Sequence, residues 1–305
     1  MRIIVTGATG FVGSSLIAKL QEENHQILAF CRNIDRARAM FPPAHFPGVE
    51  IVAYTAGLGG EWEAKIADCD AVVNLAGEPI ADRWTQQRKR EIIESRQGGT
   101  AKLVAAIAQA TSKPKVLVSS SAIGYYGTSE TATFTETSPH GEDFLAQICQ
   151  GWEAAAQKVT EVGVRLVILR TGIVLGNGGA IAKMIPPFRL FAGGPIGSGN
   201  QWFSWIHLED MVNLILEALH RSEINGVLNA TAPNPVRMVE FCTVLGEVLN
   251  RPSWIPVPKF AIEALLGDAA IVVLEGQKVQ PQRTLDYGFT YKYPTVKPAL
   301  KEILG

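Results

Sequence analysis

The sequence predicts an α/β fold, a Rossmann-like doubly wound parallel sheet with a smaller, mostly helical C-terminal substrate region. Three observations support this prediction. Short β-branched runs alternate with longer amphipathic stretches over the first 170 residues, a glycine-rich turn follows the first run, and prolines separate helical patterns near the end. The 305 residues, 47% hydrophobic and 19% charged, suffice for a large core and exclude intrinsic disorder.

Six apolar runs are expected to form the strands of the sheet. None shows the strict alternation of polar and apolar residues that is typical of a half-exposed antiparallel strand. The runs span residues 2–6, 26–31, 49–53, 71–75, 115–119 and 164–169. Between them, apolar residues at helical spacing predict helices over residues 12–22, 85–110 and 142–162.

Charge, cysteine content and hydropathy exclude several classes of protein. Lys and Arg total 28 against 29 Asp and Glu, so the net charge of −1 provides no general attraction for nucleic acid or an anionic membrane. The four cysteines form no Cys-x-x-Cys pair, which argues against a disulfide framework or a thiolate zinc site. No apolar run approaches the roughly 18 residues that span a bilayer, and no secretory leader is apparent. We therefore expect a cytoplasmic protein.

The distribution of glycine and proline divides the chain into parts. Residues 1–175 are expected to form a dinucleotide-binding domain, to which residues 205–230 return. Residues 176–204 are rich in glycine, and we interpret them as a lid segment. Residues 231–305 form the domain on the substrate side.

Two interpretations of residues 193–199 remain open. Glycines there permit a mobile lid, with the following Trp202, Phe203 and Trp205 as an aromatic hinge over the substrate. In the alternative, the loop is rigid and its aromatic residues belong to a core between the domains.

A glycine-rich turn joins the first predicted strand to the first predicted helix. Its glycines recur at three-residue spacing, and such a turn lets a pyrophosphate approach the N-terminus of the helix, where a Cβ would block it. A dinucleotide cofactor is predicted; the alternative is a purely structural turn. The expected contacts are Gly7, Thr9, Gly10, Phe11, Val12 and Gly13.

The end of the second predicted strand indicates which dinucleotide binds. An acidic residue at this place accepts hydrogen bonds from the ribose 2′-hydroxyl and repels a 2′-phosphate. The sequence has Cys31 followed by Arg32, so a guanidinium is placed to pair with the phosphate and no carboxylate opposes it. NADP(H) is therefore expected rather than NAD(H), unless Arg32 is a solvated surface residue. Arg36 and Arg38 either assist Arg32 or lie on a helix surface.

Together with later motifs, these residues resemble the short-chain dehydrogenase/reductase superfamily, in its extended and atypical epimerase/dehydratase branch. The later motifs are Asn74-Leu-Ala-Gly77, Ser119-Ser-Ser121 and residues 203–210. Residues 83–85, 170–176, 193–205 and 275–281 are similar to "epimerase family" proteins that carry an extra C-terminal domain of unknown function. The resemblance covers nearly the whole chain. It implies a sheet whose carboxyl edge carries NADP(H), with a small-molecule substrate beside it, and a homodimer built on the long helices.

The resemblance also indicates further cofactor contacts. Glu78 and Arg83 follow the Asn-Leu-Ala-Gly motif and are expected to face the cofactor groove, or else to form a surface ion pair. The whole set comprises Leu75, Ala76, Gly77, Glu78, Arg83, Ser119, Arg170 and Gly172.

The catalytic pair of the superfamily is absent from this chain. In the superfamily a tyrosine moves the substrate proton, and a lysine four residues later lowers its pKa and binds the nicotinamide ribose. When Glu153 is aligned with the acidic residue that often follows the pair, the two places hold Leu145 and Cys149, and neither can do that work.

Other residues are candidates for the missing chemistry. Ser121 matches the superfamily serine that hydrogen-bonds a substrate oxygen. Tyr125 and Tyr126 lie just beyond it and either donate a proton or pack the loop. Lys183 either replaces the missing lysine or faces solvent. His207 and Asp210 are three residues apart, a spacing that metal ligands can have. Because the sequence offers no third ligand, no metal site is expected.

The sequence leaves two functions open. The first is an NADP(H)-dependent oxidoreductase or epimerase that acts on a small polar or nucleotide-linked substrate. The second is a catalytically silent NADP(H)-binding regulator or sensor, because the nucleotide loop is retained and the Tyr-x-x-x-Lys pair is lost. The resemblance adds weight to the second, since some relatives are linked with cell division. A scaffold with an empty groove is disfavoured by Arg32 and the glycine turn.

Overall fold

The computed structural model describes residues 1–305 and has a parallel sheet at its centre, as the sequence predicts. The sheet contains the six expected strands and a seventh, residues 226–230, that the sequence analysis did not identify. The strand order is β11-β7-β5-β4-β1-β2-β3, so the chain winds outward in both directions from β1. A crevice for ligands forms at such a switch point, beyond the carboxyl ends of the strands. The strands are β1 (Arg2–Thr6), β2 (Gln26–Cys31), β3 (Val49–Ala53), β4 (Ala71–Asn74), β5 (Val116–Ala122), β7 (Arg165–Thr171) and β11 (Gly226–Ala230).

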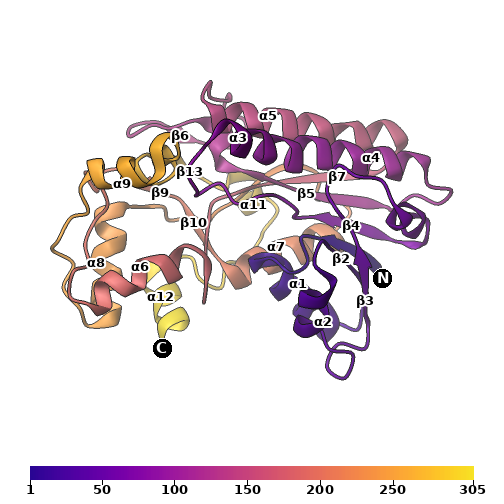
Figure 1. The fold of residues 1–305 in the computed structure, drawn as a ribbon, viewed down its shortest axis with the longest axis horizontal. Helices are drawn as coiled ribbons and strands as arrows, with labels where there is room; N and C mark the ends of the chain where they lie inside the picture. Colours follow the sequence, from indigo (N-terminus) through magenta and orange to yellow (C-terminus); the bar gives the residue numbers. More distant parts are fainter.

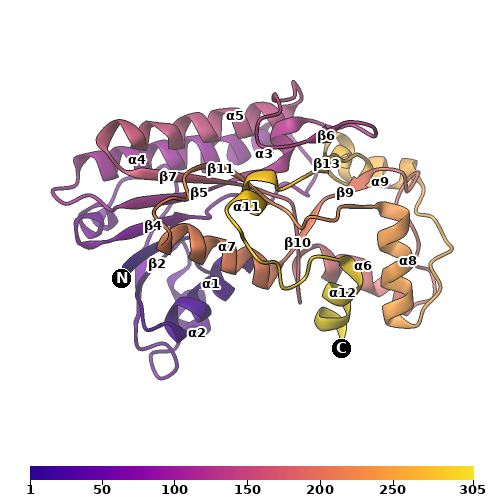
Figure 2. The same cartoon turned by 180° about the vertical axis from the view of Figure 1, so that it is seen from behind.

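Helices cover both faces of the sheet, which confirms the predicted doubly wound architecture. On one face lie α1 (Phe11–Glu22), α2 (Ile34–Met40) and α7 (Leu208–His220) (Figures 1 and 2). On the other lie α3 (Gln86–Ile93), α4 (Gly99–Gln109) and α5 (Phe144–Gln157). The apolar strand residues divide between two buried clusters, one under each helical layer. Because both faces are buried, the strands read as continuous apolar runs.

The C-terminal region lies beyond one end of the sheet, as Figure 1 shows. It has a core of its own, which contains Phe203, Trp205 and Phe241. Its helices are α6 (Gly179–Arg189), α8 (Met238–Leu249), α9 (Lys259–Leu266), α10 (Ile271–Leu274) and α12 (Val296–Leu304), whereas α11 (Gln282–Asp286) packs beside β11 of the sheet (Figure 2).

Three short two-stranded ladders connect this region to the rest. Strand β8 (Ile173–Leu175) pairs in parallel with β10 (Trp205–His207), and β9 (Trp202–Phe203) pairs antiparallel with β12 (Val236–Arg237). Strand β6 (Thr133–Phe134) pairs in parallel with β13 (Lys278–Val279). No helix in the structure combines the length and apolar composition needed to cross a bilayer.

Two predicted helices are interrupted. The helix expected over residues 85–110 is divided into α3 and α4 by a π-helical segment, Glu94–Gly98. The helix expected over residues 142–162 ends at Gln157 and continues as a 3-10 segment, Lys158–Val162. Periodicity does not reveal these changes, because a π-helical or 3-10 turn alters the spacing by less than one residue per turn.

The segment 176–204 is more regular than the sequence predicts. Helix α6 occupies Gly179–Arg189 although Pro186 and Pro187 lie inside it. Residues 193–199 are bonded to the C-terminal region: the amide of Gly197 donates to the carbonyl of Val257 at 2.9 Å, and the amide of Val257 donates to the carbonyl of Pro195 at 2.8 Å. A Cβ on Gly194 would lie 2.2 Å from the carbonyl oxygen of Ile255. These contacts favour the packed loop over the mobile lid.

Candidate cofactor and active site

A cavity of about 460 Å³ lies at the carboxyl ends of β1, β4 and β5. Its wall includes the glycine turn before α1, residues 120–124 at the end of β5, residues of α5, and residues between 271 and 277 of the C-terminal region. This volume lies within the range of about 300–1,000 Å³ that is usual for ligand sites. The position agrees with the crevice expected at the switch point of the sheet.

The glycines of the turn are required by close backbone contacts. Gly7 has φ +66°, and a Cβ on it would lie 2.8 Å from the carbonyl of Leu75. A Cβ on Gly13 would lie 2.3 Å from the carbonyl oxygen of Gly7. Helix α1 begins after Gly10 with no side-chain cap and no acidic residue in its first turn. Its first amides and its positive dipole end are therefore free to bind a pyrophosphate, so the turn fits a dinucleotide.

A buried hydrogen-bond network fixes the end of β4 beside this turn. The hydroxyl of Thr6 donates to Asn74 at 2.8 Å, and the Asn74 amide donates to Thr100 at 2.9 Å. The backbone amides of Leu75 and Ala76 both donate to the Thr6 hydroxyl, at 3.1 and 3.2 Å. Leu75 and Gly77 thereby reach the cavity wall, whereas Ser119 is fully buried behind it.

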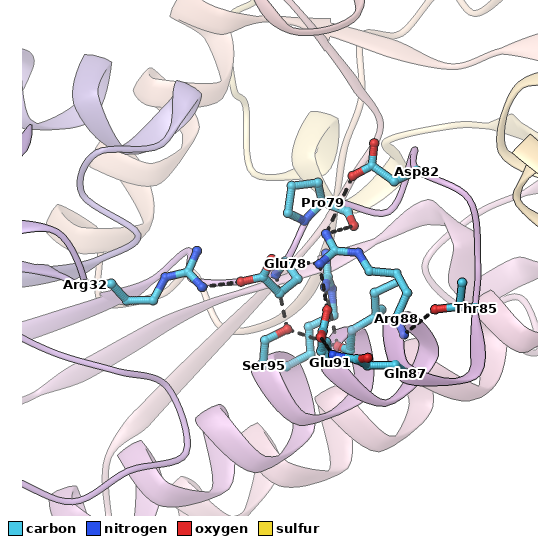
Figure 3. A network of polar contacts seen from close by, with 11 residues as sticks. Arg32, Glu78, Pro79, Asp82, Thr85, Gln87, Arg88, Glu91 and Ser95 are labelled. Atoms are coloured by element: carbon cyan, nitrogen blue, oxygen red, sulfur yellow. Dashed lines mark hydrogen bonds and ion pairs between the residues drawn. The ribbon is translucent and has the colours of Figure 1, made fainter. Parts of the chain in front are cut away.

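Arg32 lies beyond the end of β2 and pairs with Glu78 (Figure 3). The Arg32 side chain is 66% exposed, and Glu78 is also bound by Arg88 at 3.1 Å. Burial opposes ionisation of Glu78, but the hydrogen bonds and charges of the two arginines outweigh it and lower its pKa. Glu78 is thus a carboxylate shared by two guanidinium groups, and Arg32 has its charge partly neutralised.

The neighbouring arginines have separate roles. Arg36 donates to the carbonyl of Thr9 at 3.4 Å, which places it beside the glycine turn. Arg38 is exposed and lies 3.8 Å from Asp35. Arg83 does not pair with Glu78 but donates to the carbonyl of Ala264 at 3.1 Å, in the C-terminal region. Gly172 lines the cavity from the other side, after β7.

Ser121 lies in the cavity wall and is bonded to Glu153. The Ser121 hydroxyl donates to the Glu153 carboxylate at 2.7 Å. The guanidinium of Arg170 donates two hydrogen bonds of 2.8 Å to the same carboxylate. Arg170, a predicted cofactor contact, is therefore directed at Glu153, and its side chain is only 4% exposed.

Both candidate tyrosines pack around this ion pair. The Tyr126 hydroxyl donates to Asn229 at 2.7 Å and accepts from Arg170 at 3.0 Å. Burial raises the pKa of Tyr126 to about 12. The guanidinium of Arg170 lies 3.3 Å from the centre of the Tyr125 ring. Neither tyrosine is among the residues that line the cavity, and Lys183 lies on the exposed side of α6, also away from it.

The helix face that would carry the missing pair does face the cavity. Leu145 and Cys149, one turn apart on α5, both line it. Burial raises the pKa of the Cys149 thiol to about 11, so the thiol is protonated at neutral pH. At these two places the cavity wall therefore has neither a proton donor of suitable pKa nor a cation.

Polar residues that the sequence did not assign to the site also line the cavity, among them Arg96 and Gln277. Gln277 comes from the C-terminal region and donates to the carbonyl of Ile123 at 2.8 Å. Arg96 comes from the π-helical segment, which the helical pattern conceals. Gln277 lies in the motif at residues 275–281, but no local signal places it in the cavity, and no motif marks Arg96. Both positions depend on the packing of distant segments.

Comparisons with known proteins match the whole chain. A model of the NAD dependent epimerase/dehydratase family matches residues 3–230, and a model of a domain of unknown function, DUF1731, matches residues 257–303. The chain is 52% identical to the chloroplastic "Epimerase family protein SDR39U1 homolog" of Arabidopsis thaliana, over 100% of this chain and 87% of that protein. It is 40% identical to human "Epimerase family protein SDR39U1", over 100% of both.

Solved structures give a matching result. The crystal structure of human SDR39U1 (isoform 2) with NADPH has a TM-score of 0.85 and 38% identity, and the match covers 99% of both chains. A nucleoside-diphosphate sugar epimerase from Corynebacterium glutamicum has a TM-score of 0.77 and 29% identity, over 100% of this chain and 58% of that one. UDP-glucuronic acid 4-epimerase from Bacillus cereus, at 16% identity and a TM-score of 0.81, shares the fold.

Proposed function

Because the chain belongs to the NAD dependent epimerase/dehydratase family, we propose that it is an NADP(H)-dependent oxidoreductase or epimerase that acts on a small polar or nucleotide-linked substrate. The observation that carries this proposal is a single cavity that joins the glycine turn to Ser121. The NADPH of the human relative and the sugar-nucleotide activity named for the Corynebacterium relative support it.

The residues of the cavity, together with two arginines outside its wall, fit the parts of NADP(H). The amides at the start of α1 and the close-packed glycines would hold the pyrophosphate. Arg32, with Arg36 beside the turn, would bind the 2′-phosphate at the end of β2. Arg32 reaches the phosphate by leaving Glu78, which keeps Arg88 as a partner.

NADP(H), when bound, supplies hydride transfer to or from a substrate carbon. The substrate oxygen on that carbon gains or loses a proton in the same reaction. Ser121 is placed to make the hydrogen bond to that oxygen, since it lies in the wall and its own proton is directed at Glu153. Its oxygen can accept a hydrogen bond from a substrate hydroxyl, while Glu153, which is paired with Arg170, accepts the hydrogen bond of the serine. Ser121 thus orients the substrate oxygen, and the proton that this oxygen loses or gains is exchanged with solvent.

A second function is favoured by Leu145 and Cys149. Without the tyrosine and lysine, the cavity lacks the usual proton donor and the ribose-binding cation, and Cys149 is a neutral thiol. A protein that binds NADP(H) and changes its interactions with the ratio of oxidised to reduced cofactor would need no such pair.

Turnover in the presence of metabolites separates the two functions. NADPH and NADP⁺ are incubated with the protein and with fractions of a metabolite extract, and absorbance of the reduced nicotinamide is followed. The oxidoreductase proposal expects a fraction that changes this absorbance with wild type and not with Ser121→Ala, while Cys149→Ala retains turnover. The products of each fraction are also analysed for epimers. Cofactor binding with neither an absorbance change nor an epimerised product in any fraction would favour the regulator.

A further inference from the structure

Arg96 directs a cation into the cavity from the π-helical segment Glu94–Gly98. Three atoms of its guanidinium lie 3.1–3.3 Å from the place that a Cβ on Gly77 would occupy. Glycine at position 77 therefore leaves the space that the guanidinium fills. On the opposite side the guanidinium lies 5.2 Å from the centre of the Trp152 ring. Backbone and ring together fix its position in the wall, beside Cys149.

No carboxylate neutralises Arg96. None of the ion pairs within 4.0 Å includes it, and its one hydrogen bond, from Nη1 to the carbonyl of Ile92, is 3.5 Å long. Arg88, two helical turns earlier, provides the contrast. Its guanidinium contacts Glu78 at 3.1 Å and Glu91 at 3.0 Å. An arginine has five N–H donors, and most of those on Arg96 have no protein acceptor.

Such an arrangement is costly for the protein alone. Removing a charged group from water is unfavourable unless an opposite charge or good acceptors replace the water. Burial lowers the pKa of Arg96 and outweighs the opposing influence of Glu78, which forms no ion pair with it. The packing on Trp152 is worth only a fraction of the interaction that a carboxylate would give. Arg96 lines the cavity, so its remaining N–H donors are available to an anionic oxygen of a bound molecule.

We propose that Arg96 is a binding site for a phosphate or carboxylate group of the molecule that occupies the cavity. The inference rests on the proposed function in so far as that molecule is NADP(H) or its substrate. A planar guanidinium binds both groups through paired hydrogen bonds. The cofactor offers its pyrophosphate. A substrate would have to carry the anionic group itself, which restricts it to acids and phosphorylated or nucleotide-linked compounds.

Arg96→Gln tests the site, with Arg96→Lys as the conservative variant and Arg90→Gln as control. Arg90 is an exposed cation two turns earlier on α3, outside the cavity wall. NADPH is titrated into each protein by calorimetry. Thermal shifts with inorganic phosphate and with malonate are then measured on the NADPH-bound proteins. The melting temperature of each ligand-free variant is recorded as well.

We expect one of two results for Arg96→Gln: NADPH binding is weakened by at least about tenfold, or binding of phosphate or malonate to the NADPH-bound protein is weakened by that factor. The affinity of Arg96→Lys should lie between those of Arg96→Gln and wild type. The first result identifies the cofactor as the source of the anion, and the second identifies a substrate group. The ligand-free Arg96→Gln protein should melt no lower than wild type, because an uncompensated charge is removed.

If Arg96→Gln binds NADPH, phosphate and malonate as tightly as wild type, the proposed site is wrong, whatever the melting temperature of the variant. The proposed site is also wrong if NADPH binding does not depend on Arg96 and the wild type responds to neither phosphate nor malonate. A structural role predicts this outcome, with a lower melting temperature for Arg96→Gln. Failure of the wild type to bind NADPH at all would count against the proposed function instead. The phosphate and malonate shifts, measured then on the ligand-free protein, still decide whether Arg96 binds anions.

Discussion

The hydroxyl of Ser121 donates a 2.7 Å hydrogen bond to the carboxylate of Glu153 and so joins the cavity wall to a buried ion pair. Arg170 holds that carboxylate with two bonds, and Tyr126 and Asn229 continue the network into the core. Glu153 therefore both orients the serine and neutralises a guanidinium that is almost wholly buried.

Removal of Glu153 should destabilise the fold strongly. Glu153→Ala leaves Arg170 buried without its partner, and we expect a loss of about 3–5 kcal/mol in the free energy of unfolding, measured by urea denaturation. Glu247→Ala is the matched control, because Glu247 pairs with Lys297 at 2.8 Å with both side chains about half exposed. The control should lose no more than about 1 kcal/mol. Similar losses in both variants would mean that Arg170 finds other partners.

The native thiols should be unreactive at pH 8. All four cysteines are free and buried. The pKa of Cys149, raised to about 11, leaves roughly one molecule in a thousand as thiolate at that pH. A thiol-specific disulfide reagent should therefore detect none in the folded protein and four after denaturation. A rapid native reaction that Cys149→Ser abolishes would show that this thiol is activated.

Residues 193–199 should be protected from hydrogen exchange without any ligand. The amides of Gly197 and Val257 are bonded within the packed loop, and the amide of Val239 donates to the carbonyl of Gly199 at 2.9 Å. Exchange measured by mass spectrometry on the ligand-free protein should be slow in peptides that cover these amides. Fast exchange that slows on addition of NADPH would restore the mobile lid.

Substitution of Glu78 should favour NADP⁺. Glu78→Gln removes the carboxylate that competes with a 2′-phosphate for Arg32, and it removes a negative charge near that phosphate. Because the Arg32 side chain is largely exposed, the gain is expected to be modest, about twofold to fivefold in NADP⁺ affinity, with NAD⁺ affinity unchanged. Calorimetric titration of both cofactors measures it. A decrease in NADP⁺ affinity would show that Glu78 holds Arg32 in its binding position.

Features that depend on local sequence could be predicted. The strands of the sheet are encoded as apolar runs, and the glycine turn is encoded by its spacing. Both are present in the structure, and the family resemblance based on them is confirmed. The glycine content of residues 176–204 predicts a lid segment and conceals helix α6, which begins at Gly179 and has Pro186 and Pro187 in its second half.

Features that depend on distant partners could not be predicted. The family resemblance implies that Arg170 contacts the cofactor, but in the structure Arg170 pairs with Glu153 on α5 at 2.8 Å. Arg96 lies among charged residues of the helix expected over residues 85–110, whereas in the structure it belongs to the π-helical segment and lines the cavity. Propensity and periodicity carry no information about either partner, because both relationships arise when segments far apart in the chain are packed together.

Calorimetric titration of NADP⁺ and NAD⁺ into wild type and Arg32→Ala tests the central claim most directly. Arg38→Ala serves as control, because Arg38 is an exposed neighbour on α2 paired loosely with Asp35. Wild type should bind NADP⁺ more tightly than NAD⁺. Arg32→Ala should lose about 1.5–3 kcal/mol of NADP⁺ binding, with NAD⁺ binding unchanged. Equal affinity of wild type for the two cofactors, or an Arg32→Ala protein that still prefers NADP⁺ to the same degree, would contradict it.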